Sequence, residues 1–389
     1  MNDDVLIHEA EEVEKKTAAT KTMLKGHFLW VQGLIFLAGL ALLFFLLYEI
    51  GFDLIFATVS QIGWGFLFII ATNFSRHLIR ATCIYLAIPK EHRVNVGYHN
   101  VLAARLAGES MNLMTFTGPV LAEATKAAML KNRITFSRSA AAVIVDDIMY
   151  YITVALMMLS GVALMVLSVG APGKVMRYAL IGVTIGALVM LVGMFLVVRF
   201  NARPLSYVLR KLDERGWLPN FVSTKISHVY EIETNVYSVY SERPKLFYSL
   251  LGLGCLAHAT SVFEVYLALG LLGYKTTIVN SYIIESLTKV INAAFSFVPG
   301  TVGVYEGGSG IILRSLGYTA AIGVALALVR RGAILFWAAV GFVILLWRTV
   351  DSSARALKKK EATESAALAK DAVPTFTPPV AGEPVSEEA

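Results

Sequence analysis

The feature that most constrains this chain is a set of long apolar runs, each close to the length of a helix that crosses a lipid bilayer. About 20 apolar residues in a helix span the hydrocarbon core. Of the 389 residues, 56% are hydrophobic and only 16% are charged, so we predict an all-α polytopic membrane protein, transporter-like rather than a soluble enzyme. Six runs are interpreted as full spans: residues 28–47, 63–88, 140–169, 178–198, 246–272 and 320–347.

Two further apolar stretches, residues 97–131 and 278–318, are interrupted by Gly118-Pro119 and by Pro299-Gly300. The basic residues before the first span and after the last one place both termini in the cytoplasm, because cytoplasmic loops carry the excess of Lys and Arg. A full crossing by either interrupted stretch would move the basic loops to the wrong side. We therefore expect two re-entrant pairs of broken helices, which need protein or a water-filled cavity around them.

The domain limits follow from these runs. Residues 1–27 form a cytoplasmic N-terminal segment, 28–348 the membrane domain, and 349–389 a polar tail that we predict to be disordered and cytoplasmic. The linker 201–245 is polar but carries an apolar stripe that includes Tyr230, Val236 and Tyr240. Such spacing suits a helix lying at the membrane interface, and it equally suits a plain connecting helix pair.

The two parts of the membrane domain, about 62–169 and 246–348, resemble each other. A single offset along the chain carries His77 onto His258 and lays the first Gly/Pro break over the second. With a small insertion, Glu123 falls on Glu306 and Asp146 falls near Arg330. The halves enter the membrane from opposite sides in the predicted topology. This arrangement is an inverted repeat, the plan of many secondary transporters.

The run from Pro299-Gly300 through Gly303 to Glu306 is similar to the Pro-Gly-x-x-Gly-x-x-Glu element of the lysylphosphatidylglycerol synthase transmembrane (flippase-like) family. Glu123 and Lys126 resemble that family's first-half Gly-Glu-x-x-Arg element, and Arg76 and Arg80 resemble its early basic residues. The chain departs from the family where Gly118-Pro119 reverses the usual order and where Lys126 replaces Arg. The resemblance implies a translocation module, without the aminoacyl-transfer domain, that moves lipids or lipid-linked substrates across the bacterial inner membrane.

Arg76, His77 and Arg80 lie in the middle of the second predicted span. A charge at the bilayer centre costs about 2.5–3.5 kcal/mol on insertion scales, so each arginine needs a partner. The spacing i, i+4 puts the two guanidinium groups on one helix face. They are expected either to hold a lipid phosphate or to pair with a buried carboxylate, for which Glu109, Glu123 and Asp146 are the candidates.

Glu123 and Glu306 follow the two helix breaks. Each is expected either to cap a new helix or to take up a proton that couples transport to the proton gradient. At the second break, Pro299, Gly300 and Gly303 would end one helix and open the next, whose free N–H groups can hold an anion. The alternative there is a simple kink in a full span.

Three other features are candidates. His77 and His258 are paired by the repeat, although a single buried histidine is more often structural. Arg330 is expected near the outer end of the last span, where it reaches the surface or binds phosphate. Lys289 and Glu285 form an i, i+4 pair that should neutralise itself.

The sequence contains no recognised catalytic, cofactor or metal motif, so neither an enzyme nor a nucleic-acid-binding protein is expected. The function most favoured is movement of a lipid or lipid-linked anionic headgroup across the bilayer. The alternative is a non-transporting accessory subunit, or a membrane enzyme, of lipid, glycolipid or hopanoid biosynthesis. A second copy of the chain or a lipid-biosynthesis protein is a possible partner.

Overall fold

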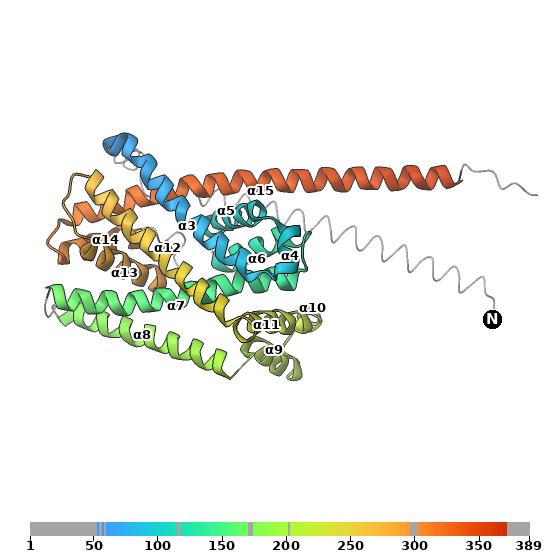
Figure 1. Ribbon diagram of the computed structural model, residues 1–389, viewed down its shortest axis with the longest axis horizontal. Helices are drawn as coiled ribbons and strands as arrows, with labels where there is room; N and C mark the ends of the chain where they lie inside the picture. Colours follow the sequence, from blue (N-terminus) through green and yellow to red (C-terminus); the bar gives the residue numbers. More distant parts are fainter. Residues whose placement is uncertain are drawn as a thin grey trace, which may run out of the picture. The chain divides into compact units, whose positions relative to one another are not determined.

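A computed structural model of the chain describes residues 53, 57, 60–114, 118–169, 174–200, 203–295, 301 and 303–371. The regular elements in this part of the chain are all helical (Figure 1). The predicted span 28–47 and the residues Pro299 and Gly300 lie outside it. The elements are η1 Gly63–Gly65, α3 Phe66–Ala87, α4 Lys90–Val96, α5 Tyr98–Met114, α6 Gly118–Leu130, α7 Phe136–Val169, α8 Lys174–Arg199, α9 Pro204–Glu214, α10 Asn220–Ser223, α11 Ile226–Ser241, α12 Pro244–Leu271, α13 Ile278–Ala294, α14 Val304–Ser315 and α15 Ala320–Asp371.

Four of the described helices are long and apolar enough to cross a membrane: Phe136–Ser168 in α7, Leu180–Val197 in α8, Pro244–Leu271 as α12 and Ala320–Thr349 in α15. They coincide with four of the six predicted spans. Helix α3, also predicted as a span, is not among them, because Asn73, Arg76, His77 and Arg80 interrupt its apolar sequence. The chain is therefore a multi-helix membrane protein by composition. One of its helices, α3, carries polar side chains within an apolar sequence, and Asn73, His77 and Arg80 among them are buried.

Each interrupted stretch forms two helices that lie side by side. Helices α5 and α6 pack against each other, and so do α13 and α14. The start of α14 is fixed by Gly303, whose φ of 76° is favourable for glycine alone, and by Glu306, whose Oε2 accepts a 2.8 Å hydrogen bond from the Gly303 N–H. In the first hairpin, Gly118 is the first residue of α6 and Pro119 the second, as expected for residues that open a helix.

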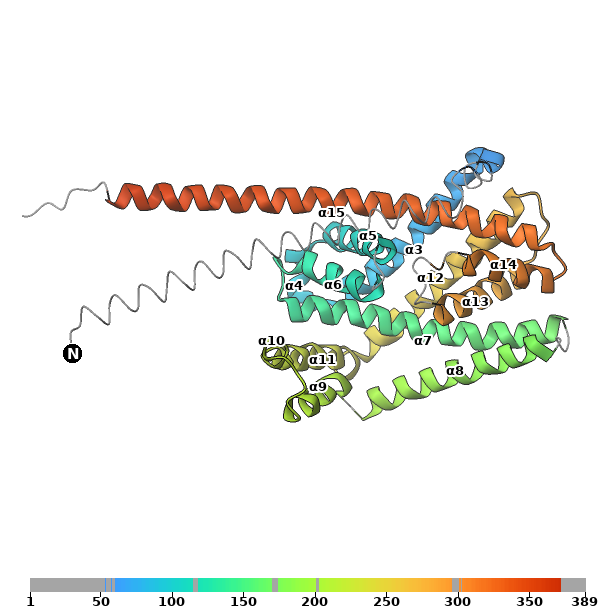
Figure 2. The same cartoon turned by 180° about the vertical axis from the view of Figure 1, so that it is seen from behind.

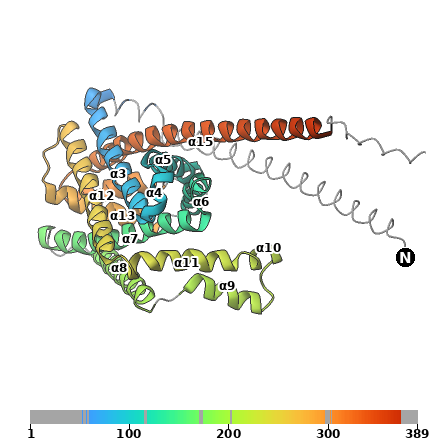
Figure 3. The same cartoon turned by 45° about the vertical axis from the view of Figure 1, so that its right-hand side comes forward.

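The linker forms α9, α10 and α11, which lie together beyond α8 (Figure 3). The apolar stripe of α11 faces the protein: Val236 is 6% exposed, and Val236, Val239 and Tyr240 pack into a core cluster with residues of α7 and α12. Tyr230 alone among the stripe's tyrosines is largely exposed, at 41%. This packing matches the connecting-helix interpretation of the stripe rather than the interfacial one.

Two glycines bring the halves into close contact. A Cβ on Gly161 of α7 would clash with the Cβ of Ser286 on α13, and a Cβ on Gly341 of α15 would clash with the carbonyl oxygen of Leu106 on α5. Figure 2 shows α13 beside α7. The offset that carries Gly161 onto Gly341 also carries Leu106 onto Ser286. The two close approaches are therefore at corresponding positions, with the halves exchanged.

The chain divides into two units, one ending at Phe342 and the other beginning at Val343. The second unit contains the end of α15, which stays helical to Asp371. The prediction of a disordered tail from residue 349 is wrong up to that point. Ala, Leu, Lys and Glu dominate this segment and favour helix, and extending an existing helix costs far less than nucleating a new one.

Candidate functional site

A cavity of about 1090 Å³ lies within the first unit, between the two helical hairpins and α3, α7, α8 and α15. Its walls carry an unusual number of charged side chains for a membrane protein interior. Of the residues selected from the sequence, eight line it: Arg76, Arg80, Glu109, Glu123, Lys126, Glu285, Lys289 and Arg330. His258 lies against Tyr150 and Glu306 against Arg331, which both line the cavity, whereas His77 contacts Trp337, which does not.

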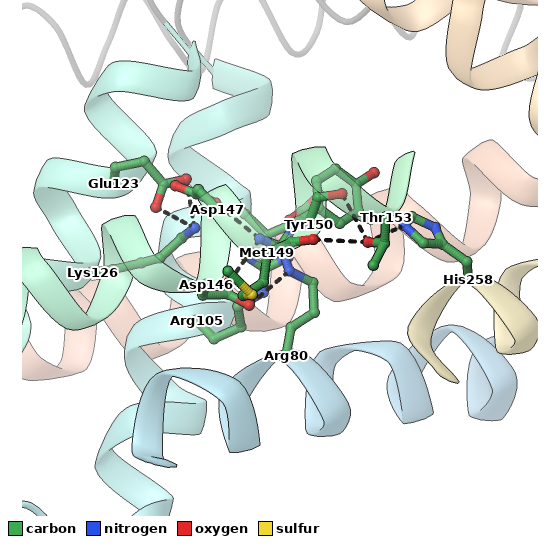
Figure 4. A network of polar contacts seen from close by, with 11 residues as sticks. Arg80, Arg105, Glu123, Lys126, Asp146, Asp147, Met149, Tyr150, Thr153 and His258 are labelled. Carbon is green, nitrogen blue, oxygen red and sulfur yellow. Dashed lines mark hydrogen bonds and ion pairs between the residues drawn. The ribbon is translucent and has the colours of Figure 1, made fainter. Parts of the chain in front are cut away.

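Arg80 is held by two carboxylates of α7 (Figure 4). Its Nη2 lies 2.7 Å from Asp146 Oδ2 and 2.9 Å from Asp147 Oδ1, and its Nε donates to Asp146 Oδ1 at 3.3 Å. The guanidinium also lies 4.2 Å from the ring centroid of Tyr150. Arg80 and Asp146 are 8% and 2% exposed. The pairing interpretation is therefore correct for Arg80, whose Nε and Nη2 donors are occupied by these carboxylates.

Arg330 is buried in the same way in the second half. Its Nε donates to Glu264 Oε1 at 2.9 Å, and its Nη1 lies 2.7 Å from Glu285 Oε2 and donates to the Tyr305 hydroxyl at 3.1 Å. Only 5% of Arg330 is exposed. The prediction that it reaches an outer surface is wrong, because α15 begins at Ala320 and carries Arg330 into the core. Glu285 also contacts Lys289 at 2.9 Å, as the i, i+4 spacing predicted.

These ion pairs repeat with their charges exchanged. Arg80 and Asp146 are 66 positions apart in the sequence, and so are Glu264 and Arg330. One offset therefore carries Arg80 onto Glu264 and Asp146 onto Arg330. The attraction between a base and an acid does not depend on which helix carries which charge. An ion pair can therefore join α3 to α7 with the base on α3, and α12 to α15 with the base on α15.

The hairpins show the same exchange. On α5, Arg105 Nη2 lies 3.8 Å from Glu109 Oε2, and on α13 the corresponding pair is Glu285 and Lys289. The offset that relates Gly161 to Gly341 carries Arg105 onto Glu285 and Glu109 onto Lys289. Arg105 is 5% exposed and was not selected from the sequence. The signal that could have found it is the offset itself, if the search had allowed an acid to replace a base.

Arg76 differs from the other cavity bases. Among the described residues it has no carboxylate within ion-pair distance, and its Nη1 donates to the Ser261 hydroxyl at 3.3 Å. The i, i+4 spacing places it one turn before Arg80, on the cavity wall. The two arginines predicted to act together are thus separated: Arg80 is neutralised by direct ion pairs, and Arg76 keeps its charge on the cavity wall.

The two glutamates after the breaks have different surroundings. Glu306 caps α14 and its Oε1 lies 2.6 Å from Arg331 Nη2. Glu123 is in the second turn of α6, and no backbone N–H of a described residue donates to it. Both of its carboxylate oxygens accept from Lys126 Nζ, at 2.6 and 2.7 Å. Lys126 is only 2% exposed. The capping interpretation therefore holds for Glu306 and is wrong for Glu123.

The two histidines join the halves. His77 of α3 packs its ring against Trp337 of α15, with 6.2 Å between ring centroids. His258 of α12 shares a 3.0 Å hydrogen bond between its Nε2 and the Thr153 hydroxyl of α7. The offset that relates the two buried ion pairs also carries Thr153 onto Trp337. Both histidines are buried, at 2% and 5% exposure, which supports a structural role at the contact between halves.

A comparison with protein-family models matches residues 29–341 to the lysylphosphatidylglycerol synthase TM region. The chain belongs to this family. No curated protein and no solved structure matched it in the corresponding searches. The match extends into both halves of the repeat, and all the residues that line the cavity of this lysylphosphatidylglycerol synthase TM region lie within the matched residues. The family relates the protein to lipid handling in a membrane.

Proposed function

We propose that this protein moves the anionic headgroup of a membrane phospholipid, or of a lipid-linked substrate, from one leaflet of the bacterial inner membrane to the other. The observation that carries the proposal is Arg76, a base on the cavity wall with which no described carboxylate forms an ion pair. The family's relation to lipids and the size of the cavity support it. No covalent bond of the lipid is made or broken in this process, so the protein is proposed to be a transporter and not an enzyme.

Arg76 suits a phosphodiester for electrostatic and geometric reasons. A guanidinium in a nonpolar surrounding is costly unless an anion or several acceptors contact it. Arginine can offer two parallel N–H donors to two phosphate oxygens, and Ser261 takes only one donor of Arg76. The acyl chains would remain in the bilayer while the headgroup enters the cavity. The other described bases of the wall are already paired, so Arg76 is the proposed primary contact.

The inverted repeat is part of this proposal. Two sets of contacts support the repeat. Gly161 of the first half lies against Ser286 of the second, and Gly341 of the second half lies against Leu106 of the first. The buried ion pairs also recur, with base and acid exchanged. If the halves are related by a pseudo-two-fold axis in the membrane plane, each half can adopt the conformation of the other, which opens the cavity to the opposite side. Cytoplasmic positions for both termini fit this topology, with the basic segments inside.

The test is reconstitution of the purified chain into liposomes that contain labelled phosphatidylglycerol, an aminoacylated derivative of it, or a polyprenyl phosphate. Leaflet exchange is followed by the loss of label accessible from outside. Wild-type protein is expected to exchange at least one of these lipids. Arg76→Ala should reduce the initial rate by roughly 10-fold or more, as expected when a charged hydrogen bond of about 1.5–3 kcal/mol is lost.

Arg314→Ala is the matched control, because Arg314 is exposed on α14 and does not line the cavity. Its exchange rate should equal that of the wild type. Arg76→Lys should lie between wild type and Arg76→Ala, since lysine keeps the charge and loses the paired donors. Equal rates in wild type and Arg76→Ala would overturn the assignment of Arg76. A wild-type protein that exchanges none of the three lipids would overturn the function itself.

A further inference from the structure

Two carboxyl groups meet on the cavity wall. Asp147 of α7 and Glu123 of α6 lie side by side (Figure 4). Both residues line the cavity. Two ionised carboxylates at neighbouring positions repel each other. A proton bound to one of the two removes this repulsion and supplies a donor for the other carboxylate.

The positive charges around this pair are too few to balance the negative charges of the carboxyl groups. Lys126 of α6 contacts Glu123, and Arg80 of α3 contacts Asp147 as well as Asp146. Three carboxyl groups thus share two cations. The other ionisable groups that act on the pair are Arg105 of α5, which has its own partner in Glu109, and Tyr151 of α7. One proton is what brings this local cluster to neutrality.

At the corresponding position in the second half, an acid lies beside a base. In the repeat, Glu306 corresponds to Glu123. Since Arg330 corresponds to Asp146, the next residue, Arg331, corresponds to Asp147. Glu306 and Arg331 form an ion pair at 2.6 Å. An acid with a base is stable when both are charged, whereas an acid with an acid is stable only when one is neutral. The exchange of charge therefore places two acids side by side in the first half, where the second half has an acid with a base.

The number of charged groups in the whole cavity relates the proton to an anionic ligand. Seven described bases line the wall: Arg76, Arg80, Arg105, Lys126, Lys289, Arg330 and Arg331. Seven carboxyl groups line it or pair with these bases: Glu109, Glu123, Asp146, Asp147, Glu264, Glu285 and Glu306. With one proton on the pair, the site carries one excess positive charge. A single monoanionic phosphodiester makes it neutral.

We propose that the Glu123–Asp147 pair binds one proton and that this proton crosses the membrane together with one anionic headgroup. The inference rests on the function proposed above. The cavity is neutral when both are bound, and neutrality lowers the cost of changing conformation in a low-dielectric surrounding. On the far side the O–H bond of the carboxyl group breaks, the proton passes to water, and the headgroup leaves with its own negative charge. Proton and anion depart together, so no net charge moves.

The first test measures the proton directly, without transport. Infrared spectra of the protein in lipid at neutral pH should contain the C=O stretch of a protonated carboxyl group, which ionised carboxylates lack. This band should disappear in Glu123→Gln and in Asp147→Asn. It should remain in Glu306→Gln, the matched control, because Glu306 has a base, Arg331, as its partner. A band that is absent from the wild type, or that survives in both variants, overturns the proposal.

The second test measures coupling. With one proton per headgroup, each unit of pH difference across a liposome should change the equilibrium ratio of labelled lipid between the leaflets about 10-fold. Glu123→Gln mimics the protonated pair, so lipid should still exchange but should no longer accumulate. Asp147→Asn gives a second variant for the same result, and Glu242→Gln, which lies outside the cavity, should accumulate lipid like the wild type.

The outcomes separate the two proposals. Wild-type exchange that ignores the pH difference overturns the coupling and leaves translocation intact. Accumulation that persists in both Glu123→Gln and Asp147→Asn overturns the assignment to this pair. A wild-type protein that moves no lipid overturns the function and its coupling together, and the infrared measurement then decides by itself whether the pair holds a proton.

Discussion

Arg330 of α15 donates a 2.9 Å hydrogen bond to Glu264 of α12, across 66 positions of the sequence. The first half contains the same connection between α7 and α3, with Asp146 in the place of the arginine and Arg80 in the place of the glutamate. The two ion pairs hold corresponding helices together in the two halves. The protein thus pairs these buried charges within each half, whereas no described carboxylate forms an ion pair with Arg76.

Arg76 and Arg80 are neighbours on one helix face, yet their removal should affect stability very differently. Arg80→Ala leaves Asp146 buried without a base and should lower the free energy of unfolding by about 3–5 kcal/mol. Arg76→Ala breaks no ion pair of a described carboxylate, so the loss should stay below about 1 kcal/mol. Thermal unfolding of both variants in the same detergent measures the difference. Equal losses would mean that Arg76 has a structural partner after all.

The Glu264–Arg330 pair should show strong coupling in a double-mutant cycle. Arg330→Gln removes the base from Glu264, which is 1% exposed, and should cost about 3–5 kcal/mol. Glu285 keeps Lys289 in that variant. Glu264→Gln together with Arg330→Gln should cost clearly less than the sum of the two single variants, because no buried charge is left without a partner. Additive losses would show that the pair contributes little.

Gly161 and Gly341 should tolerate no side chain. Alanine at Gly161 would drive its Cβ into Ser286, and alanine at Gly341 would drive its Cβ into a backbone carbonyl, so each variant should lose about 1–3 kcal/mol through overpacking. Gly193→Ala is the control, since nothing lies within 4 Å of the added atom. That variant should be neutral or slightly more stable, because alanine favours helix. The check is the melting temperature of the three proteins in one detergent.

The orientation of the linker helices can be tested by thiol labelling. In a background without Cys83 and Cys255, Tyr207→Cys on α9 should react quickly with a small maleimide in detergent, because Tyr207 is 63% exposed. Val236→Cys on α11 should react slowly, because Val236 is 6% exposed and lies in the core. Fast reaction at position 236 would restore the interpretation of α11 as an interfacial helix.

The sequence predicted what depends on local composition and periodicity. Apolar runs identified the long helices α7, α8, α12 and α15, because only a helix satisfies its own backbone in lipid. Glycine and proline located the hairpin of α5 with α6 and that of α13 with α14. The spacing of Glu285 and Lys289 predicted their ion pair. Each of these features is decided within one or two helical turns.

The partners of the buried charges were decided only by the tertiary structure. The sequence repeat placed Asp146 near Arg330, but it could not show that Arg80 and Glu264 are the residues these two bind, because both contacts join residues 66 positions apart in the chain. Which arginine faces the cavity, and that Glu123 meets Asp147, also depends on how distant helices pack. Sequence alone thus determined that charges lie inside this membrane protein. Only packing determined which of them are neutralised, because an ion pair is set by distance in space and not by distance along the chain.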